Sequence, residues 1–133
     1  MQFSRKIDYG ILLLSALKRT YSRSDFFALK DIADCYKLPF AYFEKIAFQL
    51  KKAGILEAKP GVGGGYRLAK NPGAVAIQEI IDVFEEPKML RCFQNAAHKS
   101  CSHIKSCPTQ KGWLKFNNKI SKVFQKTKIS DVI

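Results

Sequence analysis

Hydrophobic side chains recur at helical spacing through the first half of the chain. The clearest stripe follows Pro39, where apolar residues stand at i, i+3, i+4 and i+7, namely Phe43, Ile46, Ala47 and Leu50. Proline cannot continue a helix and constrains the residue before it, so Pro39 separates this stripe from the preceding helix. The pattern predicts helices over residues 5–21, 29–36 and 40–53, with Ser4 as the N-cap of the first and Gly54 at the end of the third.

Two helices joined by a short break form a helix-turn-helix, whose second helix enters the major groove of DNA. Two short strands, residues 55–58 and 66–69, follow this pair and flank a glycine-rich loop. Glycine permits positive φ and lets the backbone approach another surface closely. The loop lacks the lysine and the following helix of a phosphate-binding loop, so we expect no nucleotide site. A helix-turn-helix with such a hairpin is a winged helix, and its wing glycines are Gly61, Gly63, Gly64 and Gly65.

The second half of the chain is divided by a segment that has no clear period. We expect a short helix over residues 77–84, after which residues 86–108 carry three cysteines without helical or strand spacing. The helical period returns over residues 109–126, where the apolar stripe is narrow and consists of Trp113, Phe116, Ile120 and Val123. A narrow stripe suits a helix that packs against a partner helix. We therefore predict a mainly α fold with a small β-hairpin wing, organised as a DNA-binding domain (residues 1–85), a cysteine-bearing loop (86–108) and a long C-terminal dimerisation helix with its tail (109–133).

The charge of the chain indicates a polyanionic partner. The formal net charge is +12, and between Glu86 and Asp131 there are nine lysines and Arg91 but no acidic residue. These lysines either form a solvated face or add a general electrostatic attraction toward DNA. The longest apolar run, residues 10–14, is far below the roughly 20 residues of a membrane span, and the first residues show no signal-peptide core, so we expect a cytoplasmic protein. We find no enzymatic constellation.

Three of the four cysteines, Cys92, Cys101 and Cys107, lie in the irregular segment, with eight and five residues between them. Zinc sites and bacterial ferredoxins more often use C-x-x-C pairs, whose tight turns direct two sulfurs at one metal. A wider spacing needs a loop that wraps around something larger, and an iron–sulfur cluster fits it. Reactive or buried thiols are the alternative. Cys35 lies apart in the helix-turn-helix, where we expect a small residue that packs between helices.

Several motifs together carry a resemblance over nearly the whole chain. The motifs are the opening Asp8-Tyr9-Gly10, the helical segment Tyr42-Phe43-Glu44-Lys45-Ile46, the wing from Gly63 to Leu68, the three spaced cysteines and the ending from Lys128 to Val132. In this order they resemble the Rrf2 family of bacterial winged-helix regulators, which includes IscR-type and NsrR-type iron–sulfur proteins. The resemblance implies a homodimer held by the C-terminal helix, which binds a double-stranded DNA operator with two half-sites.

The resemblance also implies the ligands of a cluster, either 2Fe–2S or 4Fe–4S. The three cysteines leave one position open, for which Asp8, His98, His103, water or a small thiol are candidates. IscR-type members use a histidine three residues after the last cysteine, where this chain has Gln110. Asp8 matches the position from which NsrR-type members supply a carboxylate to the cluster of the opposite subunit. The chain is therefore closer to the NsrR type.

By family position, Tyr42, Glu44 and Lys45 face the operator from the second helix of the helix-turn-helix. Lysine can donate a hydrogen bond to guanine, and glutamate can accept one from cytosine. Many relatives carry an arginine where this chain has Pro60, so insertion of that side chain into the minor groove is absent here. The basic residues expected at phosphates or on the wing are Arg5, Lys6, Lys59 and Arg67.

These patterns predict a DNA-binding transcriptional regulator, in the first place a repressor, whose operator affinity changes with the state of an iron–sulfur cluster. The expected signal is nitric oxide or the redox or iron status of the cell. The alternatives are an IscR-like regulator of iron–sulfur cluster biogenesis and, in a different class, a small iron–sulfur electron carrier. A winged-helix protein with structural zinc or with bare thiols is a third reading. The patterns leave open whether the clustered or the bare form binds DNA.

Overall fold

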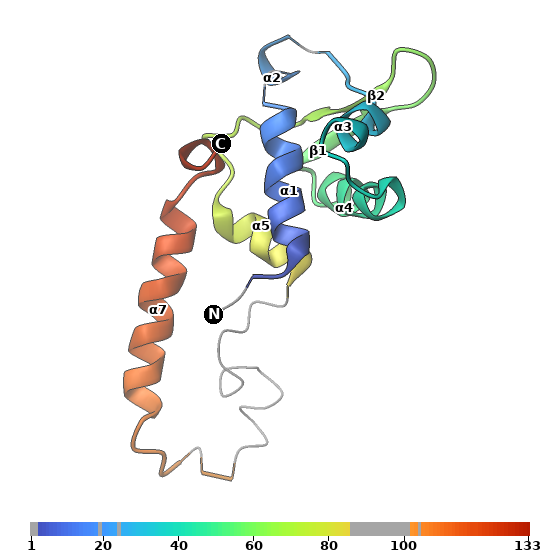
Figure 1. The fold of residues 1–133 in the computed structure, drawn as a ribbon. Coiled ribbons are helices and arrows are strands. Elements are labelled where there is room, and N and C mark those ends of the chain that lie inside the picture. Colours follow the sequence, from blue (N-terminus) through green and yellow to red (C-terminus); the bar gives the residue numbers. More distant parts are fainter. Residues whose placement is uncertain (1–2, 19, 24, 86–101, 104) are drawn as a thin grey trace.

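The computed structural model describes residues 3–18, 20–23, 25–85, 102–103 and 105–133. The predicted mainly helical fold with one antiparallel hairpin is confirmed. Helix α1 stands between α7 on one side and α3, α4 and the hairpin on the other (Figure 1). Within the described part, no helix combines the length and hydrophobicity of a membrane span. The elements are α1 (Arg5–Ala16), α2 (Thr20–Arg23), α3 (Leu29–Cys35), α4 (Phe40–Lys52), β1 (Leu56–Lys59), β2 (Gly65–Leu68), α5 (Ile77–Phe84), α7 (Gln110–Lys126) and η2 (Ile129–Asp131).

The hydrophobic core lies where α4 packs against α1, α3, β1 and α5, and where α1 also packs against α5. Full burial of one large apolar side chain contributes about 1.5–3 kcal/mol, so this face of α4 fixes the rotation of the helix about its axis. The face opposite the core is therefore turned to solvent. The four apolar positions predicted for α4 are all buried, namely Phe43, Ile46, Ala47 and Leu50.

Gly54 ends α4 as the sequence predicts. Its φ of +73° is a left-handed value that glycine adopts without strain. The Gly54 N–H donates to the carbonyl of Lys51, and the Ile55 N–H donates to the carbonyl of Leu50. This pair of hydrogen bonds is the Schellman motif, which satisfies carbonyls at the end of a helix. The chain thereby leaves α4 in the direction of β1.

The hairpin is fastened to the segment before α3 at the end of its strands next to the loop. Its strands pair from Leu56 opposite Leu68 to Lys59 opposite Gly65. Phe27 then exchanges two backbone hydrogen bonds with Tyr66, at 3.0 and 2.8 Å. At Gly65, φ is +143° and an added Cβ would lie 2.1 Å from the carbonyl oxygen of Phe27. Only glycine allows the two backbones to come this close.

Helix α1 is shorter than predicted, because it ends at Ala16 rather than near residue 21. Neither proline nor glycine marks this end in the sequence. Leu17 is fully buried, and the Lys18 N–H donates to the carbonyl of Ser15, which tightens the last turn. The Lys18 ammonium group then bonds the carbonyl of Ile133, 2.7 Å away. A contact with the other end of the chain thus accompanies the break, and no local pattern reveals such a contact.

Two further expectations about single residues are wrong. Ser4 occupies the N-cap position of α1, but its side chain makes no capping hydrogen bond. Its backbone N–H donates instead to the Glu85 carboxylate, 2.7 Å away, so the start of α1 is tied to the end of α5. Cys35 is exposed and does not pack between helices.

The tail after α7 returns to the core, which the sequence pattern did not predict. Ile129 in η2 is buried, and its N–H donates to the carbonyl of Val75 at 2.9 Å. Ala76 and Lys128 form an isolated antiparallel bridge, and the Ile77 N–H donates to the carbonyl of Thr127. The C-terminal end of α7 is therefore joined to the beginning of α5.

Gly65→Ala and Gly54→Ala separate the strain of a left-handed backbone from steric overlap, because both glycines have positive φ but differ in the space around them. Gly54→Ala adds a Cβ with nothing within 4 Å and should lower the free energy of unfolding by about 1–2 kcal/mol, the strain of the left-handed backbone. Gly65→Ala also makes the new Cβ overlap with the Phe27 backbone, and should lower the free energy of unfolding by about 3 kcal/mol. Chemical denaturation of both variants measures the difference, and equal losses would contradict the close approach of the two backbones.

Candidate DNA-reading surface and metal ligands

The N-terminal half of α4 presents polar side chains to solvent. Because Phe43 points into the core, Glu44 and Lys45 are exposed on the outer face. Tyr42 is half-buried, and its ring meets that of Tyr9 in α1 edge to face, with the centroids 5.6 Å apart. Glu44 and Lys45 are therefore free to reach base edges, whereas Tyr42 is partly engaged in packing α4 on α1.

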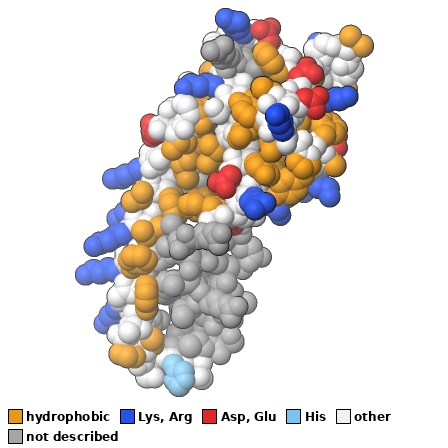
Figure 2. All heavy atoms as spheres, in the orientation of Figure 1, with side chains coloured by type: hydrophobic (Ala, Val, Ile, Leu, Met, Phe, Trp, Pro, Cys, Tyr) orange, Lys and Arg blue, Asp and Glu red, His pale blue; other side chains and the backbone are white. Residues whose placement is uncertain are grey.

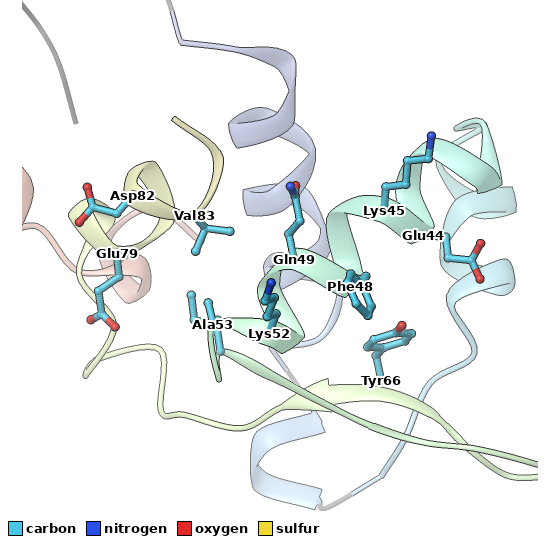
Figure 3. Close-up of a pocket in the computed structure, with 11 residues that line it drawn as sticks. Glu44, Lys45, Phe48, Gln49, Lys52, Ala53, Tyr66, Glu79, Asp82 and Val83 are labelled. Carbon is cyan, nitrogen blue, oxygen red and sulfur yellow. The ribbon is translucent and has the colours of Figure 1, made fainter. Parts of the chain in front are cut away.

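A groove of about 1010 Å³ runs along α4 from Glu44 and Lys45 toward α5. Figure 3 shows the rings of Phe48 and Tyr66 beside one another at one end, and the carboxylates of Glu79 and Asp82 at the other. Burial, and then the negative charge of Glu44, raise the pKa of the Tyr66 hydroxyl above its ordinary value. The groove is thus continuous with the face that carries the predicted reading residues. Its full lining is Glu44, Lys45, Phe48, Gln49, Lys52, Ala53, Ile55, Tyr66, Glu79, Asp82 and Val83.

Phe48 is a member of this surface that the sequence analysis missed. Its side chain is 58% exposed, although phenylalanine is usually buried. It stands one turn after Glu44 and on the same face. The signal was present in the sequence, because Phe48 falls outside the buried stripe of α4 and is therefore an apolar residue at a position expected to meet solvent.

The two predicted cations of the wing lie in different surroundings. Lys59 is exposed at the end of β1. The guanidinium of Arg67 donates a hydrogen bond to Glu57 on the neighbouring strand and lies 4.7 Å from the centre of the Phe26 ring. Arg67 therefore helps to hold the base of the wing, and the expected phosphate contact of Arg67 stays a prediction.

The beginning of α1 carries Arg5, Lys6 and Asp8, and all three side chains are exposed. Asp8 lies in the first turn, where the helix dipole favours a carboxylate. Its neighbour Tyr9 turns the other way and packs on Tyr42. A candidate metal ligand and a contact to α4 are thus adjacent in the chain and point to different sides of one helix.

The same part of α1 also touches the last residues of α5. A Cβ added at Gly10 would lie 2.8 Å from the ring of Phe84, so the ring packs directly on the helix backbone. The Ser4 N–H donates to Glu85, and the ring of Phe3 lies 5.9 Å from that of Phe124 in α7, centre to centre. Helices α4 and α5 therefore contact the first turns of α1, and α7 contacts Phe3 just before this helix.

Of the predicted metal ligands, Cys92, Cys101 and His98 lie outside the described residues. Cys107 is half-buried, and its sulfur lies 3.4 Å from the Thr109 hydroxyl oxygen. Hydrogen bonds from Thr109 and its neighbour hold the pKa of the Cys107 thiol below its ordinary value, which favours the thiolate that soft metals bind. His103 is exposed. Among the residues with described positions, no group of three metal-binding side chains comes together, so the chemistry of Cys107 fits a cluster but the full ligand set stays a prediction.

No side chain of helix α7 is fully buried in the part of the chain that the structure describes, although Ile120 is half-buried and Phe124 packs partly against the core. Trp113, Phe116 and Val123 are exposed, and the first two rings meet edge to face with centroids 5.8 Å apart. Figure 2 shows hydrophobic side chains along α7 beside a row of basic ones. The stripe predicted from the sequence is thus present as an apolar strip on one helix, open to solvent in a single chain.

Comparison with known proteins places these features in a family. The family model described as "Iron-dependent Transcriptional regulator", Rrf2, matches residues 3–133. The chain is 31% identical to the HTH-type transcriptional regulator NsrR of Shouchella clausii over 80% of this chain and 71% of that protein. Such relatives are transcriptional regulators, which confirms the expectation that the chain is not an enzyme.

Solved structures show the same fold. CymR, the global cysteine regulator of B. subtilis, has a TM-score of 0.75 at 23% identity, covering 99% of this chain and 95% of that one. IscR of T. potens has a TM-score of 0.69 at 26% identity, covering 99% and 85%. The chain belongs to the Rrf2 family of DNA-binding transcriptional regulators.

Proposed function

We propose that the chain is a homodimeric repressor whose affinity for its operator depends on an iron–sulfur cluster, and that nitric oxide or redox and iron status is the signal. It acts in the cytoplasm on double-stranded DNA. The observation that carries this proposal is the placement of Asp8 and Tyr9. One side of α1 presents the exposed carboxylate of Asp8, and the other packs Tyr9 on Tyr42 of α4. A change felt at Asp8 thus has a direct physical route to the helix that reads DNA.

Four residues would hold the cluster: Cys92, Cys101 and Cys107 of one subunit and Asp8 of the other. The lowered pKa of Cys107 supports this assignment, since thiolates are the usual ligands of iron–sulfur clusters. When bound, such a cluster would have one iron atom held by the Asp8 carboxylate. Cluster iron prefers sulfur ligands, so it would hold this oxygen ligand weakly and could exchange it. This hard fourth ligand favours the NsrR type over the IscR type. It also makes the site depend on how two subunits meet.

The contacts of α1 support a coupling of the kind that such a regulator would require. A cluster changes DNA affinity only if it binds one arrangement of the protein better than another. The predicted cluster loop begins directly after Glu85, which holds the Ser4 N–H, and Phe84 packs on Gly10. A shift of this loop would therefore pull on the start of α1. From there Tyr9 would pass the shift to α4.

Lys45→Ala tests the reading surface, with Lys51→Ala as the matched control, because Lys51 is exposed in the last turn of the same helix. Loss of a base contact by Lys45 should weaken binding by about 1–3 kcal/mol and relax the preference at one base pair. Lys51→Ala should leave the sequence preference unchanged. Binding of each variant to operators selected from a random library measures both effects, and an unchanged preference in Lys45→Ala would remove Lys45 from the surface.

Phe116→Glu tests the dimer, with Lys115→Ala as a control that changes the net charge by the same amount. A carboxylate at position 116 would have to lose its water in an interface between two α7 helices, so the variant should be monomeric at micromolar concentration. Lys115→Ala should stay dimeric. Sedimentation velocity gives the masses directly. A monomeric wild-type protein, or a dimeric Phe116→Glu variant, would show that this strip of α7 does not hold the subunits together.

Asp8→Ala tests the cluster, with Asp25→Ala as a control at an exposed carboxylate remote from α1 in the chain. Protein purified without oxygen should be brown and contain iron and sulfide. Asp8→Ala should change its visible spectrum and reduce the effect of the cluster on operator binding by about tenfold, while Asp25→Ala should change neither. A spectrum and binding unaffected by Asp8→Ala would exclude this ligand. A colourless wild-type protein that still selects its operator would exclude the cluster and would indicate a regulator that responds to another signal. A brown protein that does not bind DNA would support the electron carrier.

A further inference from the structure

The tip of the wing offers an unusual chemical surface for a DNA-binding loop. Between Lys59 and Tyr66 the sequence is Pro-Gly-Val-Gly-Gly-Gly, so Val62 is the single side chain there other than the proline ring. Its relative exposure is 106%, which means that it is as open to solvent as in an extended peptide. Residues 60–65 themselves carry no polar side chain, and the exposed Lys59 stands where the loop begins. The tip can therefore offer another molecule an isopropyl group and backbone atoms.

The backbone holds Val62 in this position. Gly61 and Gly63 on either side have φ of +89° and +73°, and the Gly64 N–H donates to the carbonyl of Gly61 at 3.1 Å. An added Cβ at Gly64 would lie 2.1 Å from the carbonyl oxygen of Lys59, so the two sides of the loop are in close contact. Together with the hydrogen bonds between Phe27 and Tyr66, these constraints project Val62 outward as a fixed feature.

The wing projects on the side of the molecule that carries α3 and α4 (Figure 1). When α4 lies in the major groove, a hairpin on this side meets the neighbouring minor groove or its sugar–phosphate walls. Of the two cations on the hairpin, Lys59 is exposed where the loop begins and can meet a phosphate wall, whereas Arg67 is held by Glu57 and Phe26 farther along the strands. An isopropyl group can form neither a hydrogen bond nor an ion pair with a phosphate. It does fit against the sugars and base edges of a minor groove.

The geometry points to Val62 as a specificity-determining residue, which enters the minor groove beside each half-site and reads the absence of the exocyclic amino group of guanine. In the minor groove this donor is what distinguishes G·C from A·T pairs. A valine side chain placed over it would bury the donor without a partner, which is unfavourable. The wing would therefore select A·T pairs by an apolar contact. This inference rests on the proposed DNA-reading surface.

Base analogues test this inference without touching the major groove. Operators are first selected from a random library with the wild-type protein, and the wing position is located by hydroxyl-radical protection of minor-groove sugars. At that position, replacing adenine by diaminopurine adds the amino group, and should weaken wild-type binding about tenfold. Replacing a G·C pair by inosine·C removes the group, and should restore binding to the level of an A·T pair.

Val62→Thr is the matched variant, because threonine keeps the branched shape and adds a hydroxyl that can accept a hydrogen bond from the amino group. It should bind the A·T operator nearly as well as the wild type but discriminate against diaminopurine by less than threefold, within the net strength of one hydrogen bond. Lys45→Ala should weaken binding while keeping the full discrimination. Equal binding of the wild type to adenine and diaminopurine operators, or full discrimination in Val62→Thr, would overturn the role of Val62 alone. Failure to select any operator would overturn the reading surface on which it rests.

Discussion

The packing of Phe84 on Gly10 holds the beginning of α1 against the end of α5, and the rest of the candidate regulatory apparatus depends on this contact. A helix-interior glycine is unfavourable by about 1 kcal/mol relative to alanine, and here its missing Cβ is replaced by an aromatic ring. The residues from Phe3 to Tyr9 contact Phe124, Glu85 and Tyr42, so α7, the end of α5 and α4 meet at one short stretch of chain. Any element that moves α5 or α7 must either move α1 or lose this packing.

Elements defined by local chemistry could be predicted from the sequence. Helix α4 has a proline before it, a buried stripe along it and a glycine after it, and each of these signals acts within a few residues. The end of α1 could not be predicted in this way, since it coincides with the burial of Leu17 and a bond between Lys18 and the C-terminus. The return of Ile129 to the core is likewise a contact over a long sequence distance. Such contacts produce no regular spacing of apolar residues in the sequence from which they could be predicted.

In the candidate site, too, features set by local sequence could be predicted, whereas those set by contacts distant in the sequence could not. Exposure of Glu44 and Lys45 follows from the rotation that the buried face imposes on α4, so the pattern was sufficient to place them. The engagement of Arg67 with Glu57 and Phe26 depends on strand register and on a neighbouring loop, and the sequence predicted for Arg67 only a phosphate or wing contact without these partners. Cys35 was expected to pack between helices of the helix-turn-helix, yet its position on α3 faces solvent.

The bridge between Ala76 and Lys128 has a geometric consequence for an assembled pair of chains. It fastens the C-terminal end of α7 to the first residues of α5, so the long helix behaves as a rigid strut of the DNA-binding unit instead of a flexible tether. In a pair joined through α7, the two copies of α4 would then stand at a nearly fixed distance and angle. Such a pair would tolerate base changes inside a half-site more readily than the insertion of a few base pairs between half-sites, because insertion rotates one binding face around the duplex.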